Sequence, residues 1–119
     1  MKSINPANGQ LIEEHKAHTP EEVNEILIAV DKEWQSWKNT SFAERAALMR
    51  KASEIMLAER DECAAILTAE MGKIKKEARA EIEKWALVCR HYADTAAETL
   101  QDEIVETAYS KSYIAFQPI

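Results

Sequence analysis

The sequence predicts a mainly α-helical fold with a short β-hairpin at each end. Four stretches of the 119-residue chain carry apolar residues at the three-to-four-residue spacing of an amphipathic helix. An Asn-Gly pair near the start and β-branched and aromatic residues near the end indicate the two hairpins. With 46% hydrophobic residues, the chain can bury a modest core and forms one domain or a piece of one.

The first hairpin is predicted around the segment Asn5–Gly9. This segment ends in Asn-Gly, a pair that tolerates the positive φ angles of hairpin turns. The residues Gln10–Glu14 would form the returning strand. Because a two-stranded ribbon is only marginally stable in isolation, we expect it to lie on another element.

A capping box predicts the start of the first helix. Thr19 supplies the N-cap oxygen, Pro20 suits the first helical position, and Glu22 stands where the box requires a carboxylate. The helix should end near Lys38–Asn39. Its apolar stripe consists of Val23, Ile26, Leu27, Val30, Trp34 and Trp37.

A second capping box, Ser41 with Glu44, opens the next helix. The pattern breaks or kinks around Glu59–Asp61, and a third helical stretch then stops at Gly72, a typical left-handed terminator. The second stripe consists of Leu48, Met49, Ala52, Ile55 and Met56. The third consists of Cys63, Ile66, Leu67 and Met71.

The fourth and longest helix is expected over about Lys75–Leu100. Its stripe consists of Ala78, Ile82, Trp85, Cys89, Tyr92, Ala96 and Leu100. Two strands should follow at Ile104–Tyr109 and Ser112–Gln117, joined at Ser110–Lys111. Because this last strand runs straight to Ile119, we expect the protein to continue beyond it.

Composition excludes several classes of function. The net charge of -6 and the sequence pI of about 5.1 argue against nucleic acid as a partner, since phosphate binding requires a basic surface. The sequence has neither the apolar run that a membrane span requires nor the apolar segment of a signal peptide. A cytoplasmic location is therefore expected.

No constellation in this chain predicts a catalytic or cofactor site. Two glycines, Gly9 and Gly72, cannot build a phosphate-binding loop, and the histidines lack metal-ligand spacing with the cysteines. Cys63 and Cys89 each lie on an apolar helix face, which favours core packing for both. Cys63 is the better candidate nucleophile, because it stands near a helix start, where a thiolate would be stabilised.

Glu70 is the unusual acidic residue, because it lies in the last turn of its helix, against the helix dipole. A tolerated surface carboxylate is the simpler interpretation, and a cation or backbone amides as its partner is the alternative. Glu77 and Glu83 should be exposed, and Glu81 should lie at the edge of an apolar stripe. Large core residues are expected at Trp34, Trp37 and Trp85.

Several segments, in order, resemble the N-terminal part of the aldehyde dehydrogenase superfamily. They are Ile4–Gly9, Trp34 with Trp37, Ala43–Arg45, Glu70–Lys73, Arg90–Ala93 and Phe116–Ile119. The resemblance covers the whole chain. Within the superfamily, the pattern is most similar to bacterial succinate-semialdehyde dehydrogenases. It departs from the family at Ile74, where many members have proline.

The resemblance implies that residues 1–119 are the N-terminal helical segment of the nucleotide-binding domain, lacking the Rossmann-like core. Family members oxidise an aldehyde to a carboxylic acid with NAD or NADP. A cysteine attacks the carbonyl, hydride passes to the nicotinamide, and a glutamate activates the hydrolytic water. All of these parts belong to later sequence, so the resemblance assigns this chain no catalytic, cofactor-binding or metal-binding residue.

The resemblance also implies three structural roles. The hairpin at about residues 104–117 matches the start of the family's oligomerisation hairpin, so the parent is expected to be a homo-oligomer. Ser3, Ile4 and Glu70 match positions that hold a structural monovalent cation in some members. The region Lys84–Val88 matches a helix that borders the tunnel through which the aldehyde enters.

Without the missing core, the chain is expected to be inactive and to self-associate through exposed apolar helix faces and its C-terminal hairpin. Two alternatives remain open. One is a self-contained helical protein–protein interaction module, which a stop codon after Ile119 would favour. The other is a thiol redox or metal protein using Cys63 and Cys89, which thiol titration with and without zinc would test.

Overall fold

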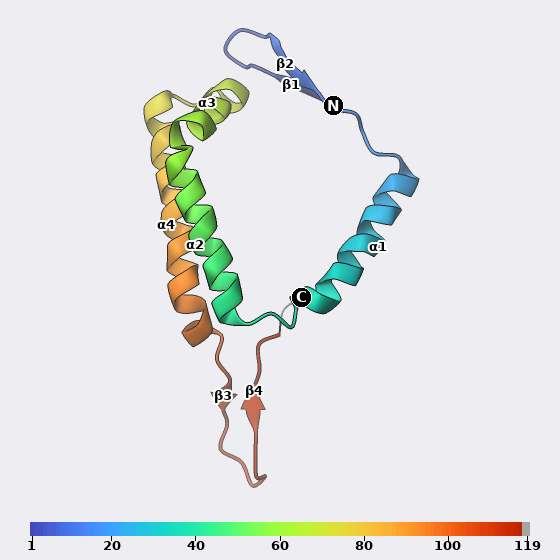
Figure 1. The fold of residues 1–119 in the computed structure, drawn as a ribbon, viewed down its shortest axis with the longest axis vertical. Helices are drawn as coiled ribbons and strands as arrows, with labels where there is room; N and C mark the ends of the chain where they lie inside the picture. Colours follow the sequence, from blue (N-terminus) through green and yellow to red (C-terminus); the bar gives the residue numbers. More distant parts are fainter. Residues whose placement is uncertain (118–119) are drawn as a thin grey trace.

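The computed structural model describes residues 1–117 and confirms a mostly helical chain with a small antiparallel hairpin near each end (Figure 1). The elements are β1 (Lys2–Ile4), β2 (Leu11–Glu14), α1 (Pro20–Trp37), α2 (Phe42–Ala58), α3 (Arg60–Met71), α4 (Lys75–Thr99), β3 (Glu103–Ile104) and β4 (Tyr113–Ile114). Each of the four predicted helices is present, and each begins and ends close to its predicted boundary.

Both predicted capping boxes form. In α1, the Glu22 amide donates to Thr19 Oγ1 over 3.2 Å, and the Thr19 amide donates to the Glu22 carboxylate over 2.8 Å. In α2, the Glu44 amide donates to Ser41 Oγ over 3.2 Å, and the Ser41 amide donates to the Glu44 carboxylate over 2.7 Å. The backbone amide of Ser41, and then its hydroxyl, lower the pKa of Glu44.

Replacing Ser41 with alanine should therefore destabilise α2 by about 1 kcal/mol, because one amide at the start of the helix loses its acceptor. A lower urea midpoint with an unchanged slope would show this loss. The matched control is Ser110→Ala in the exposed C-terminal loop, which should leave the midpoint unchanged. Equal midpoints for Ser41→Ala and the parent chain would contradict the capping role.

The core lies between α4 and the α2–α3 pair, which run alongside it (Figure 1). Its buried apolar residues are Ala64, Ala78, Ile82 and Ala86. Ser53 is also fully buried, because its hydroxyl donates to the Ala86 carbonyl over 2.8 Å and so fixes α2 against α4. The described residues thus form one small core, composed largely of alanine.

The predicted apolar stripes are only partly buried. Leu48 and Ile55 of α2 are exposed, because α2 faces α4 through Ser53 instead. The expectation that the tryptophans are core residues is wrong for this chain: Trp34 is half-buried, and Trp37 and Trp85 are 43% and 42% exposed. Among residues 1–117, none of the three tryptophans is fully buried.

The overall shape is extended. The radius of gyration is 20.4 Å, whereas a compact domain of this length has a value of about 13.5 Å. The accessible surface is 9772 Å², against about 6,500 Å² for a compact protein of this mass. Helix α1 contains no buried residue and stands away from the α2–α4 pair (Figure 1).

The C-terminal hairpin is shorter than predicted. The strands expected at Ile104–Tyr109 and Ser112–Gln117 pair only over Glu103–Ile104 and Tyr113–Ile114, with one further bond from the Val105 amide to the Ser112 carbonyl. Beyond that point the Thr107 hydroxyl bonds to the Ser112 hydroxyl over 2.7 Å and accepts from the Tyr109 amide. These side-chain bonds replace the ladder with a loop. Of the terminal motif, Pro118 and Ile119 lie outside the described residues.

Candidate functional site

The N-terminal hairpin contacts the C-terminal end of α3. Ser3 Oγ donates to Glu70 Oε1 over 2.7 Å, although the two residues are 67 positions apart. The expected cation ligands Ser3 and Glu70 are therefore neighbours, and Ile4 follows Ser3 in β1. This hydrogen bond explains how a carboxylate is tolerated at the C-terminal end of a helix. The Ser3 hydroxyl donates to Glu70, so the carboxylate has a partner without a bound ion.

Gly72 makes this contact possible. It ends α3 with a φ of +70°, and a Cβ atom placed on it would lie 3.1 Å from Pro6 Cγ in the hairpin loop. The loop itself turns at Gly9, whose φ is +73°, and it spans more residues than a tight two-residue turn. The hairpin therefore packs against the chain that leaves α3.

Replacing Gly72 with alanine should destabilise this junction by about 1–2 kcal/mol, because the left-handed backbone conformation disfavours a Cβ and Pro6 must move. Faster hydrogen exchange of the β1–β2 amides would report the loss. The control is Gly9→Ala, which has the same backbone strain but no atom within 4 Å of the added Cβ. If both variants loosen the β1–β2 hairpin equally, the contact with Pro6 has no role.

The outer face of α4 carries the segment expected to border a tunnel. A shallow depression of about 700 Å³ lies here, lined by Lys73, Glu77, Ala80, Glu81, Lys84, Trp85, Val88 and Cys89. Lys73 and Glu81 form an ion pair across it, so Glu81 at the stripe edge has a partner. Glu77 and Glu83 are exposed, as predicted.

The two cysteines occupy different surroundings. Cys63 is half-buried and packs against the cluster formed by Ala64, Ala78 and Ile82, as its core assignment predicts. Cys89 is half-buried and borders the α4 depression rather than the core. Both thiols are free, and no hydrogen bond between either sulfur and an acid or imidazole is present among residues 1–117.

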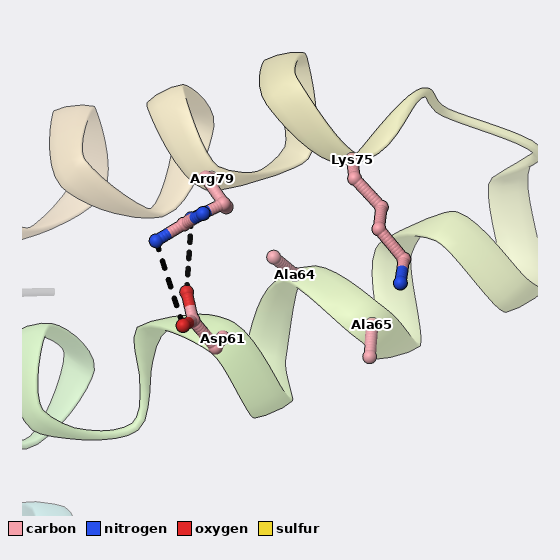
Figure 2. Close-up of a pocket in the computed structure, with 5 residues that line it drawn as sticks. All are labelled: Asp61, Ala64, Ala65, Lys75 and Arg79. Atoms are coloured by element: carbon pink, nitrogen blue, oxygen red, sulfur yellow. Dashed lines mark hydrogen bonds and ion pairs between the residues drawn. The ribbon is translucent and has the colours of Figure 1, made fainter.

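A small pocket of about 200 Å³ lies between the start of α3 and the first turns of α4 (Figure 2). Arg79 of α4 points toward Asp61 of α3, with Nε 2.9 Å and Nη2 3.5 Å from its carboxylate oxygens. Arg60 forms an ion pair with Glu83 over 2.8 Å. The hydrogen bond to Glu83, and a smaller effect of the one to Asp61, raise the pKa of Arg60. The Arg79–Asp61 pair in this pocket and the nearby Arg60–Glu83 pair both join α3 to α4.

A larger apolar groove lies at the opposite end of the α2–α4 pair. Its volume is about 680 Å³, and its walls come from the α1–α2 turn, α2, α4 and the segment after β4. Trp37, Phe42, Met49, Tyr92 and Phe116 are among its lining residues. Sequence reasoning missed this groove, because its walls come from segments far apart in the chain.

The described residues place limits on the chemistry. Within residues 1–117, no three His, Cys, Asp or Glu side chains lie close enough together to hold a metal ion. Over the same range, no helix combines the length and apolar character that crossing a bilayer demands.

Comparison with known proteins identifies the family to which this chain belongs. The sequence profile of the aldehyde dehydrogenase family matches residues 1–119. A probable NADP(+)-dependent succinate-semialdehyde dehydrogenase of Synechocystis is 48% identical over 119 residues, which are 100% of this chain and 26% of that protein. An NADP(+)-dependent succinate-semialdehyde dehydrogenase 1 of Mycobacterium tuberculosis is 35% identical over 122 residues, again 100% of this chain and 27% of that protein. The chain thus spans about a quarter of the length of the curated relatives it matches.

Solved structures share the same backbone. Succinic semialdehyde dehydrogenase of Streptococcus pyogenes, solved with NADP+, matches 94% of this chain and 25% of its own, with a TM-score of 0.86 and 26% identity. The structure of Gox0499 matches 99% of this chain and 26% of its own, with a TM-score of 0.93 and 26% identity. The helices and hairpins therefore match the N-terminal part of this fold, and the chain belongs to the aldehyde dehydrogenase family.

Proposed function

We propose that residues 1–119 are the N-terminal helical part of an NAD(P)-dependent aldehyde dehydrogenase that oxidises succinate semialdehyde to succinate. The observation that carries this proposal is the 48% identity, over all 119 residues, to a relative named for that activity. A cytoplasmic location follows from the same proposal.

The structural support is the uncovered apolar surface. Helix α1 has no buried residue, and the chain exposes about 3,300 Å² more surface than a compact protein of its mass. In the parent enzyme these faces would pack against a Rossmann-like core that holds the cofactor. The catalytic cysteine and glutamate would also lie there.

Two surfaces acquire roles under this proposal. The C-terminal hairpin extends away from the helices and exposes Ile104 and Tyr109, at 74% and 82%, which suits the start of an oligomerisation hairpin (Figure 1). The parent would then be a homo-oligomer. The α4 face containing Lys84 and Trp85 would border the tunnel through which the aldehyde reaches the cysteine.

The decisive experiment starts from the DNA downstream of codon 119. The proposal expects an open frame that continues through a glycine into a βαβ pattern. The full product should reduce NADP or NAD in the presence of succinate semialdehyde, whereas the 119-residue chain should not. A stop codon directly after Ile119 would instead favour the helical interaction module, and a full product inactive on every aldehyde would contradict the proposal.

Calorimetric titration of the 119-residue chain with NAD or NADP should give no saturable heat. Its two glycines lie in a hairpin loop and at a helix end, so neither belongs to a loop that could surround a phosphate. The full product serves as the positive control. Saturable binding by the short chain would show that a cofactor site lies within it.

A further inference from the structure

The loop of the N-terminal hairpin contains an asparagine that is followed by a glycine. Of the four asparagines, Asn5, Asn8, Asn24 and Asn39, only Asn8 has this neighbour. Asparagine is one of the thermolabile residues of proteins, because the next amide nitrogen can attack its Cγ atom. A following glycine has no Cβ to shield that nitrogen. Asn8 and Gly9 are exposed, and no atom of the described residues lies within 4 Å of a Cβ placed on Gly9.

Hydrogen bonds hold the Asn8 side chain beside the peptide that would attack it. The Gln10 amide donates to Asn8 Oδ1 over 2.9 Å, and Asn8 Nδ2 donates to Gln10 Oε1 over 3.4 Å. The first bond closes a ring of atoms that includes both Asn8 Cγ and the Gly9 nitrogen, so the side-chain carbonyl is folded toward that nitrogen. The same Gln10 amide would stabilise the negative charge that develops on Oδ1 when Cγ is attacked.

One hydrogen bond opposes this reaction. The Gly9 amide donates to the Asn5 carbonyl over 2.8 Å and must release it before the nitrogen can lose its proton. Because the loop is exposed, this opening is local and costs far less free energy than unfolding the chain. The reaction should therefore proceed in the folded chain, but more slowly than in an unfolded peptide.

The other three asparagines lack this combination and serve as internal controls. Asn5 precedes Pro6, whose nitrogen carries no proton to lose. Asn24 lies within α1, where the helical backbone holds the following amide away from its side chain. Asn39 precedes Thr40, whose β-branched side chain shields the nitrogen.

We propose that Asn8 is a modification site, at which the chain spontaneously loses ammonia and takes up water to give aspartate and isoaspartate. The Gly9 nitrogen loses its proton to solvent and bonds to Asn8 Cγ, and the Cγ–Nδ2 bond breaks as ammonia leaves with a proton from solvent. Water then opens the cyclic imide. Opening at Cγ gives aspartate, and opening at the backbone carbonyl carbon gives isoaspartate. The proposal does not depend on the proposed enzymatic activity.

The isoaspartate form should loosen the contact between the hairpin and the end of α3. Its backbone runs through Cβ and Cγ, which lengthens the loop and turns the carbonyl that accepts from Gln10 into a backbone group. The same loop places Pro6 against Gly72. Exchange of the β1–β2 amides should be faster in the isoaspartate form than in a fresh Asn8→Asp chain, which has the charge on an unchanged backbone. Equal exchange in the two forms would contradict this consequence.

Tryptic peptide mapping of the chain after storage in warm, weakly alkaline buffer tests the proposal. The peptide of residues 3–16 should gain the mass difference between OH and NH2 and separate into two species, one of them a substrate for isoaspartyl methyl transfer. Fragmentation should place the change at Asn8 and not at Asn5. The rate should rise several-fold per pH unit, because the attacking nitrogen must lose its proton. Asn8→Gln should leave the peptide unchanged, since its longer side chain would have to close a larger ring.

An isolated peptide of residues 3–16 is the positive control, because it has no folded loop to open. Conversion of Asn8 in the chain, with Asn24 and Asn39 intact, would support the proposal. An unchanged Asn8 at the time when the isolated peptide has fully converted would overturn it. Conversion of Asn39 as fast as Asn8 would also overturn it, because the loop would then confer no selectivity.

Discussion

Replacing Ile82 with alanine should unfold the α2–α4 pair at room temperature. Ile82 is the largest fully buried side chain among the described residues. Its core cluster also contains Ala64 and Ala78, with the partly buried Met56, Cys63 and Leu67 packed against it. Losing its buried methyl and methylene groups costs about 2–5 kcal/mol, because their transfer free energy is lost and a cavity is left behind. So small a core leaves little stability in reserve, and the loss should exceed it.

Circular dichroism during urea titration would measure this effect. Ile82→Ala should lack the cooperative transition of the parent chain. The matched control is Ile66→Ala, because Ile66 is 60% exposed and should change stability by less than about 0.5 kcal/mol. A shared midpoint for Ile82→Ala and the control would mean that the helices are held together by contacts other than this core.

The amides of α1 should exchange with solvent at least about a hundredfold faster than those in the centre of α2 and α4. An 18-residue helix without buried side chains is only marginally stable in water, whereas α2 and α4 are held by Ile82 and by the Ser53 hydrogen bond. The measurement is made at a concentration at which the chain is monomeric.

Native-state hydrogen exchange read by mass spectrometry resolves the helices separately. The capping box at Thr19 should slow exchange only in the first turn of α1. Thr19→Ala should remove that local protection and leave the α2–α4 amides unchanged. Equal protection of α1 and α4 in the monomer would show that α1 packs against the rest of the chain.

Local chemistry in the sequence predicted the helices well. The two capping boxes and Gly72 determine where α1, α2 and α3 begin or end, and each acts within a few residues of the chain. The N-terminal hairpin was also predicted, although its loop is wider than the Asn-Gly signal indicates. The resemblance of whole segments to a known family identified the correct fold.

Long-range contacts were predicted less well. The buried positions of α2 and α4 include Ser53 and Ala86, which a hydrophobic stripe does not indicate, because they pair through a hydroxyl and a carbonyl. The tryptophans were assigned to a core because periodicity reports which face is apolar and not what covers it. The hydrogen bond between Ser3 and Glu70 joins two residues that the resemblance had matched to one cation site, and the site itself stays a prediction. The groove at Phe42 and Tyr92 had no signal in any single segment.

Small-angle X-ray scattering from the chain, at a concentration at which it is monomeric, tests most directly whether this chain lacks a partner for its apolar faces. Our interpretation predicts a radius of gyration of 20.4 Å or more, with α1 and both hairpins extending from the α2–α4 pair. A value near the compact-domain figure of about 13.5 Å would contradict it, because the apolar faces would then be buried within a single molecule.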